Sequence, residues 1–275
     1  MFPAMTETGS IRHAARRLTA TGSETLDDTV ADEIVAEETA VALVYNGVSH
    51  AVMMATPCDL EDFARGFSLS ERIVETPSEI FDIEVEPVGR GLEVRLRIAG
   101  QRMAGLQERR RSLAGRTGCG LCGVESLDAA LRAVAVVEAP LAVSAAAIRR
   151  AMAELPARQP INQLNGATHA AGWADADGTL VAVREDVGRH NALDKLLGAL
   201  AKSGAARPGG FIVVTSRCSY EMVQKAASGG ASAIAAVSAP TSLAIATAGQ
   251  ANIALVAFVR GDRLTVYAHA DRIGA

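Results

Sequence analysis

The stretch FIVVTSRCSYEMVQKAASGGASAIAAVSAPTSLAIATAGQANIALVAFV, residues 211–259, alternates short apolar runs with segments of helical spacing. Its runs FIVVT, AIAAV and IALVAFV contain almost no polar residue. Short continuous apolar runs between helical patterns are typical of strands in a sheet that is covered on both faces. The next run, LTVYA at 264–268, follows after only RGDR, which predicts a hairpin and therefore a mixed sheet. This part of the chain predicts an α/β architecture.

The same alternation extends toward the N-terminus of this region. LVAV at 180–183 precedes VGRHNALDKLLGAL, in which the leucines form one helical stripe. Two further helices are expected upstream, one around Leu127 and Leu131 and one that starts after Ser144, buries Ile148 and Met152, and ends at Pro156.

Residues 26–105 have a different pattern, typical of a small α+β region. VALVYNGVSHAVMMATP, 41–57, places Asn46-Gly47 between two apolar runs, which predicts a hairpin. Asp59 is expected to cap a helix that buries Leu60, Phe63 and Phe67. FDIEVEP and LEVRLRI alternate apolar and charged residues, which indicates two half-buried antiparallel strands.

The chain thus divides into four predicted segments. These are a mobile tail at 1–25, the small α+β region at 26–105, an arginine and cysteine loop at 106–123, and the α/β domain at 124–275. The formal net charge of −4 argues against a general nucleic-acid binder. No apolar run reaches the roughly 18 residues of a membrane span, and the N-terminus lacks a secretory apolar region. Four cysteines are too few for a disulfide scaffold, so free thiols in the cytoplasm are expected.

The loop GRTGCGLCG, 115–123, sets Cys119 and Cys122 among glycines and close behind three consecutive arginines. Positive charge favours a thiolate, which is the nucleophilic form of cysteine. Structural zinc would need a second ligand pair, and the sequence offers none at matching spacing. A thioredoxin-like dithiol switch usually opens a helix early in a small fold, which this loop does not do. Sulfur transfer or anion binding is favoured, and the dithiol switch stays open.

Polar residues follow several of the predicted strands. REDVGRHNALDK, 184–195, lies at a strand-to-helix turn, and TSRCSYEMVQKAASGG and SAPTSLAI repeat that arrangement. Ligands of open α/β sheets bind at such carboxyl ends. In the alternative interpretation Asp186 only caps a helix and Arg189 is solvated. The last such stretch is FVRGDR, which comprises Phe258, Val259, Arg260, Gly261, Asp262 and Arg263. It is either a polar hairpin turn or a site whose arginines bind phosphate and whose Asp262 accepts a hydrogen bond from guanine.

Together TPCDLEDFARGFSLSERIV (56–74), GCGLCG, REDVGRHNALDK, SRCSYEMVQKAA and SAPTSLAI resemble the FdhD/NarQ family of formate dehydrogenase accessory sulfurtransferases, in order, from about residue 28 onward. The resemblance implies that a cysteine desulfurase loads sulfur as a persulfide on the C-x-x-C loop. The sulfur then passes to the molybdenum or tungsten cofactor that carries two guanine dinucleotides, before that cofactor enters formate dehydrogenase. It also implies a cytidine-deaminase-like mixed sheet behind a smaller region, and a homodimer.

Residue by residue, the resemblance implies that Cys119 carries the persulfide, with Cys122 as its partner, and that Phe258–Arg263 binds the cofactor. Guanine nucleotides are expected to act as mimics of that cofactor. No structural zinc is expected, because the deaminase motifs H-x-E and P-C-x-x-C are absent. Cys58 and Cys218 are treated as incidental. Two alternatives remain: a chaperone that binds the cofactor without chemistry, and a dithiol redox protein.

Overall fold

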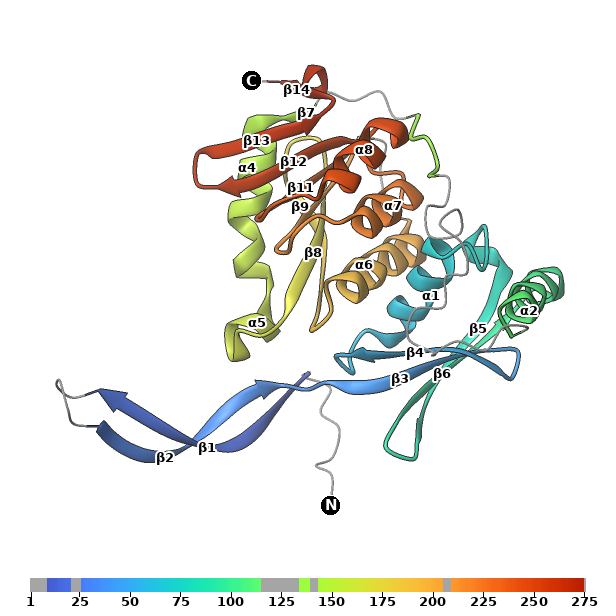
Figure 1. Cartoon of the computed structure of the whole chain (residues 1–275), viewed down its shortest axis with the longest axis horizontal. Coiled ribbons are helices and arrows are strands. Elements are labelled where there is room, and N and C mark those ends of the chain that lie inside the picture. Colours follow the sequence, from blue (N-terminus) through green and yellow to red (C-terminus); the bar gives the residue numbers. More distant parts are fainter. Residues whose placement is uncertain (1–8, 21–25, 115–133, 139–142, 205–208, 275) are drawn as a thin grey trace.

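The computed structural model describes residues 9–20, 26–114, 134–138, 143–204 and 209–274, and every structural statement below refers to these ranges. Within them a six-stranded sheet and a four-stranded sheet lie on either side of a central pair of helices, and a two-stranded ribbon projects from the rest (Figure 1). None of the described helices has both the length and the apolar character needed to cross a bilayer.

The six-stranded sheet has the order β13-β12-β11-β10-β8-β9. Its strands are β8 (His169–Ala174), β9 (Leu180–Asp186), β10 (Phe211–Val214), β11 (Ala233–Ala236), β12 (Ala254–Arg260) and β13 (Arg263–Ala268). Strands β10, β11 and β12 are parallel to one another, whereas β8 is antiparallel to both β9 and β10, and β13 is antiparallel to β12. The predicted mixed sheet and its terminal hairpin are confirmed.

Helices cover both faces of this sheet because its strands are apolar on both faces. The helices α6 (Arg189–Ser203), α7 (Tyr220–Ser228) and α8 (Ser242–Ala251) share one core with Trp173, Ile212, Ile234 and Leu255. Helix α4 (Ala145–Glu154) packs on the opposite face, against Phe211, Val213 and Val256. Ser144 caps α4 as expected, since its hydroxyl accepts from the backbone N–H of Ala147 at 3.0 Å. The mixed α and β architecture is thus confirmed, whereas the likeness to cytidine deaminases stays a prediction.

The four-stranded sheet has the order β4-β3-β6-β5 and holds the second core. Its strands are β3 (Thr39–Tyr45), β4 (Val48–Ala55), β5 (Ile80–Val88) and β6 (Gly91–Ile98), and α1 (Leu60–Ser70) and α2 (Gly100–Ala114) accompany them. Asn46 and Gly47 both have positive φ between β3 and β4, which confirms the predicted hairpin. Helix α1 buries Leu60, Phe63 and Phe67 as expected. Asp59 occupies the N-cap position as expected, but it has a left-handed conformation and its side chain makes no capping bond, so only the position of the cap is confirmed.

The two parts of the chain meet where α1 packs against α6. A Cβ atom placed on Gly66 would lie 1.7 Å from the carbonyl oxygen of Asp194, and one on Gly198 would lie 1.9 Å from that of Asp62. The two glycines therefore allow the backbones of the two helices to touch. Larger side chains at these positions would keep the helices apart, since the usual separation between helix axes of about 8–10 Å depends on the side chains at the contact.

The remaining elements are short. They are α5 (Pro160–Asn165), the paired strands β7 (Val143–Ser144) and β14 (Ile273–Gly274), and the three-ten helices η1 (Pro77–Glu79), η2 (Leu155–Arg158) and η3 (Ala270–Arg272).

Three further features differ from the predictions. Residues 10–20, assigned to a mobile tail, form β1 (Ser10–Ala20), which pairs along its whole length with β2 (Leu26–Ala36). Backbone pairing orders this stretch although its side chains are polar. Residues 106–114, assigned to the loop, belong to α2, because Met103 and Leu106 bury that helix against the second core. Strand β8 was not predicted at all.

Candidate functional site

The functional motifs of the second half meet at one edge of the six-stranded sheet. Strands β9, β10, β11 and β12 run in the same direction, so their carboxyl ends share that edge, and β8 begins there. The stretches that follow them are 187–188, 215–219, 237–241 and 261–262. The edge therefore gathers the predicted strand-to-helix turns, as expected for an open α/β sheet.

Arg189 is the first residue of α6 and stands at this edge. Its Nε atom is inaccessible to solvent and has no hydrogen-bond partner, and the described residues supply no ion-pair partner to its guanidinium. A buried donor without a partner costs about 1–3 kcal/mol, because it loses its hydration and no hydrogen bond replaces it. Such a group can bind an anion, but the side chain as a whole is half-buried, so the alternative interpretation of a solvated Arg189 stays open.

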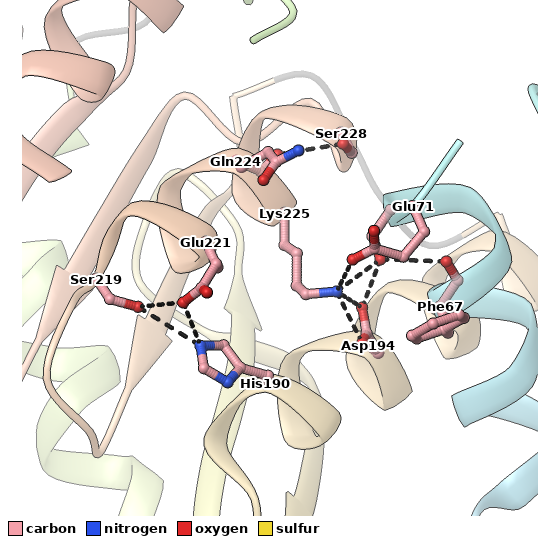
Figure 2. A network of polar contacts seen from close by, with 10 residues as sticks. Phe67, Glu71, His190, Asp194, Ser219, Glu221, Gln224, Lys225 and Ser228 are labelled. Atoms are coloured by element: carbon pink, nitrogen blue, oxygen red, sulfur yellow. Dashed lines mark hydrogen bonds and ion pairs between the residues drawn. The ribbon is translucent and has the colours of Figure 1, made fainter. Parts of the chain in front are cut away.

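His190, which follows Arg189 in the chain, forms a polar group with Glu221 and Ser219 (Figure 2). The Nε2 atom of His190 lies 3.0 Å from Glu221 Oε2 and 3.5 Å from the hydroxyl of Ser219. A hydrolase triad needs its carboxylate and its hydroxyl on opposite nitrogens of the ring, and here both face the same one. Burial, followed by the charge of Arg189, lowers the pKa of His190 although Glu221 opposes the shift.

His169 begins β8 and pairs in register with Asp186. Burial and then the charge of Arg189 lower its pKa as well. Burial and the charge of Arg189 thus disfavour protonation of two imidazoles on different elements, β8 and α6.

The segment Phe258–Arg263 lies at the same edge and comprises the end of β12, the turn at 261–262 and the first residue of β13. Phe258 and Gly261 have φ angles of 52° and 55°, and the Phe258 N–H donates to the carbonyl of Ser238 at 3.3 Å. Arg260 Nε donates to the carbonyl of Val237 at 3.1 Å. Arg260, Asp262 and Arg263 are exposed. The described residues place no carboxylate against either arginine, so both can meet a ligand, and the cofactor-binding role stays a prediction.

A fully buried ion pair supports the edge from below. Lys195 Nζ lies 2.7 Å from Asp186 Oδ2, and neither side chain is accessible to solvent. Both atoms also bind the backbone of Thr56, since Asp186 accepts its N–H at 3.0 Å and Lys195 donates to its carbonyl at 2.9 Å. The cap of α6 is Gly188, so Asp186 anchors the turn instead of capping the helix. A lysine inside an apolar helical stripe was the sequence signal for this pair, and it was missed.

A second buried cation joins α1, α6 and α7 (Figure 2). Lys225 Nζ lies 2.9 Å from Asp194 Oδ1, 3.1 Å from Glu71 Oε1 and 3.0 Å from the hydroxyl of Ser70. Burial opposes the charge on Lys225, but the two carboxylates outweigh it and raise its pKa. The cluster is satisfied internally, so its role is to hold α7 and its neighbours at the edge.

Cys119 and Cys122 lie outside the described residues, as does Arg116. The backbone of α2 includes Arg109, Arg110 and Arg111, whose side chains lie outside the described part of the chain.

The two described cysteines are free thiols in unreactive settings. Cys218 is buried, and burial raises its pKa to about 12. Burial also raises the pKa of Cys58, although Lys195 opposes this shift from 4.0 Å away. Cys58 lines a cavity of about 440 Å³ with Asp59, Glu61 and Asp62. No cluster of three or more His, Cys, Asp or Glu residues suited to a metal ion occurs in the described ranges.

Comparison with known proteins adds four findings. The model of the FdhD/NarQ family matches residues 36–274. The chain is 57% identical to the sulfur carrier protein FdhD of Cupriavidus necator over 239 residues, which cover 87% of this chain and 83% of the relative. It is 50% identical to a protein of the same name from Xanthomonas campestris pv. campestris over 265 residues, 96% of this chain and 92% of the relative. A crystal structure from Desulfotalea psychrophila, provisionally assigned as a formate dehydrogenase accessory protein, shares 26% identity and a TM-score of 0.72 over 96% of this chain and 99% of that one.

Proposed function

The chain belongs to the FdhD/NarQ family, and we propose that it carries sulfur from a cysteine desulfurase to the molybdenum cofactor with two guanine dinucleotides, before that cofactor enters formate dehydrogenase. The general role in sulfur carriage is supported by relatives named sulfur carrier protein FdhD. Formate dehydrogenase as the client is supported by the structural neighbour assigned as an accessory protein of that enzyme. The cofactor is the substrate in this proposal.

The loading step assigns the nucleophile to Cys119. Its thiolate attacks the outer sulfur of the desulfurase persulfide, a new S–S bond forms on Cys119, and the desulfurase thiolate leaves. The surrounding arginines of the sequence favour the ionised thiol.

Delivery has two balanced routes. In one, the S–S bond on Cys119 breaks, the outer sulfur passes to the cofactor, whose metal would supply the two electrons and become oxidised, and the Cys119 thiolate remains. In the other, Cys122 attacks the inner sulfur of Cys119, so that sulfide leaves for the metal and a Cys119–Cys122 disulfide remains. The second route requires a cellular dithiol to reduce that disulfide before the next cycle.

The observation that carries the proposal is the cationic sheet edge. Arg189, Arg217, Arg260 and Arg263 stand at it without a carboxylate partner among the described residues. Guanidinium groups bind phosphates through paired, charge-assisted hydrogen bonds. The donors present therefore fit the pyrophosphates of a guanine dinucleotide, and Asp262 in the same turn can accept from the donor edge of guanine. By the same reasoning we expect guanine nucleotides to act as mimics.

The test is persulfide labelling. The protein is incubated with a cysteine desulfurase and cysteine, and its mass is measured under non-reducing conditions. We expect one added sulfur in the wild type and in the matched control Cys58→Ala, and none in Cys119→Ala. Wild-type labelling of Cys119→Ala would overturn the assignment of Cys119. Activation of formate dehydrogenase by Cys119→Ala would instead favour a chaperone without chemistry.

Three further expectations belong to this proposal. A homodimer is expected, and light scattering after size exclusion measures it. Cytoplasmic location is expected, and fractionation of cells that produce the tagged chain checks it. Turnover of disulfide substrates would favour the dithiol redox alternative, and its absence would remove that alternative.

A further inference from the structure

The ribbon of β1 and β2 has no part in the proposed sulfur transfer, and among the described residues no layer covers it beyond its base. It projects from the body past Ser10, whose hydroxyl binds Asn165 (Figure 1). All of the ribbon except Ala36 precedes the stretch that matches the family. A two-stranded ribbon alone is marginally stable in water, because it buries little apolar surface. We therefore expect one of its faces to lie on another surface.

One face of the ribbon carries exposed apolar side chains. Leu18 is 55% exposed, and Val30 is 82% exposed. Val30 pairs with Arg16, two residues before Leu18, so Leu18 and Val30 lie on the same face. Arg12 shares this face with Arg16, and Asp32 is the one acidic residue on it among the described side chains. The face thus combines apolar surface with an excess of positive charge.

The charges of the two strands oppose pairing of two ribbons edge to edge. Strand β1 carries Arg12, Arg16 and Arg17 and no acidic residue, whereas β2 carries four acidic residues and no basic one. A closed twofold pairing would place β1 beside β1 or β2 beside β2, and like charges on adjacent strands repel. Pairing of β1 with β2 of another copy is not closed and would build a filament. A face of the ribbon is therefore the better contact surface.

The four-stranded sheet has an uncovered face of matching chemistry. Helices α1 and α2 pack against its inner face, in the second core. On the outer face the register aligns Met54 with Ala40 and Val52 with Ala42. Met54 is 50% exposed and Val52 is 63% exposed. These four residues form an apolar patch at the end of the sheet where β3 begins, two residues after the ribbon ends.

The rest of this outer face is acidic overall. Strands β5 and β6 place four carboxylates and two guanidinium groups on it, namely Asp82, Glu84, Glu86 and Glu93 against Arg95 and Arg97. Arg95 is already paired with Glu86 and Glu93. An apolar patch beside an excess of negative charge complements the ribbon face, which has an apolar surface and the opposite excess.

We propose that two copies of this chain exchange ribbons, so that the ribbon of each copy lies across the outer face of the four-stranded sheet of the other. Leu18 and Val30 then pack against the patch that contains Val52 and Met54. One twofold axis forms both contacts, because each copy supplies one ribbon and one sheet face.

The dimensions of the ribbon suit such an interface. Beyond its base the ribbon is roughly 30 Å long and 10 Å wide, at about 3.4 Å a residue and 4.8 Å between strands. Two reciprocal contacts of this size bury roughly 1,200 Å² in total, which reaches the range of specific interfaces, about 1,200–2,000 Å². The exchange goes beyond the proposed function, because neither surface includes the C-x-x-C segment or the carboxyl edge of the six-stranded sheet.

Light scattering of the full chain after size exclusion tests the exchange. At about 50 μM, above the micromolar dissociation constant of a weak interface of this area, the wild type should have twice the chain mass of 28.5 kDa. The ribbon variant Leu18→Glu/Val30→Glu should weaken association about tenfold or more, because charges replace apolar contacts. The sheet variant Val52→Glu/Met54→Glu should do the same. The matched control Val181→Glu, on the exposed side of β9, should weaken association less than about twofold. Circular dichroism verifies that each variant folds.

Cross-linking identifies the two surfaces directly. One chain carries Val30→Cys, and a second chain with a tag of different mass carries Val52→Cys. In both, every native cysteine except the buried Cys218 is replaced by alanine. A short bismaleimide should join the mixed chains. The matched pair of Val181→Cys with Val52→Cys should give no such product.

Three results would overturn the proposal: a monomeric wild type, a dimer that neither double variant weakens, or a mixed pair that cross-links no more than its control. A monomeric chain whose ribbon variant loses binding to the desulfurase would assign the ribbon to that partner instead. The persulfide assay separates this failure from that of the proposed function. Both double variants should accept sulfur as the wild type does, whereas an unlabelled wild type that still forms the cross-linked dimer would count against sulfur carriage alone.

Discussion

Replacement of Lys195 by Met removes the cation from the fully buried pair under the sheet edge. Lys195 Nζ lies 2.7 Å from Asp186 Oδ2 and 2.9 Å from the carbonyl oxygen of Thr56, in a setting without solvent access. Methionine fills a similar volume but donates no hydrogen bond and carries no charge. The substitution therefore leaves an unpaired carboxylate and an unbound carbonyl inside the protein.

The magnitude follows from the burial of both partners. Removal of one partner from a buried ion pair costs about 3–5 kcal/mol, because the other charge stays in a medium of low polarity. A typical domain is stable by only about 5–15 kcal/mol, so Lys195→Met should unfold at much lower urea concentration. The double variant Asp186→Asn/Lys195→Met removes the stranded charge as well. It should be less destabilised than the sum of the single changes, by about 1–3 kcal/mol.

Urea unfolding followed by tryptophan fluorescence measures this effect. Trp173 is the single tryptophan of the chain, is 1% exposed, and packs in the same core as α6. Lys202→Met is the control, since Lys202 lies on the same helix in an exposed pair with Glu61 and should change stability by less than about 1 kcal/mol. A loss below about 1 kcal/mol in Lys195→Met would refute the reasoning, because the pair would then be hydrated or relaxed in solution.

Three other outcomes are expected. Gly66→Ala should lower the free energy of unfolding in urea by about 1–3 kcal/mol or more, since its Cβ would lie 1.7 Å from a carbonyl oxygen of α6. The control Gly105→Ala, in open space on α2, should be neutral or stabilising, and equal stability of the two variants would contradict the helix contact. Folding lowers the pKa of His169 and His190, so the unfolded chain binds more protons than the folded chain as the pH falls. The free energy of unfolding should therefore fall from pH 7.5 to 5.5, and an equal fall in His169→Asn/His190→Asn would exclude these groups as the cause. Cys218, whose pKa is raised to about 12, should resist a thiol reagent at pH 8 until guanidinium unfolds the chain. Peptide mass analysis measures this, and modification of Cys218 in the native sample would contradict the prediction.

Local pattern predicted most strands of the fold, and its failures have identifiable causes. Strand β8 has the sequence HAAGWA, whose small residues carry neither the alternation nor the β-branched side chains that mark a strand. Gly172 stands within it because a Cβ there would crowd Leu180, Val213 and Leu155 at 3.0–3.2 Å. Helix α2 was taken for a loop because its second half is dominated by charge.

The candidate site was only partly predictable for a different reason. The order of elements along the chain places REDVGRHNALDK at a strand-to-helix turn. That order predicts its position at the carboxyl edge of the sheet. Whether Arg189 has a partner depends on which residues approach from other elements, and no local pattern encodes that. The bonds from Asp186 and Lys195 to Thr56 likewise join residues more than a hundred positions apart.

The ribbon of β1 and β2 has a mechanical consequence. Beyond its base, where Asn165 binds the hydroxyl of Ser10 at 2.9 Å, the ribbon extends away from the body and exposes Leu18 and Val30 (Figure 1). A two-stranded hairpin without a covering layer is marginally stable by itself, so its outer half resists bending and twisting only weakly. Strand β2 nevertheless runs into β3 after only Glu37 and Glu38. A force applied at the tip of the ribbon therefore reaches, along the covalent chain, β3, an inner strand of the four-stranded sheet.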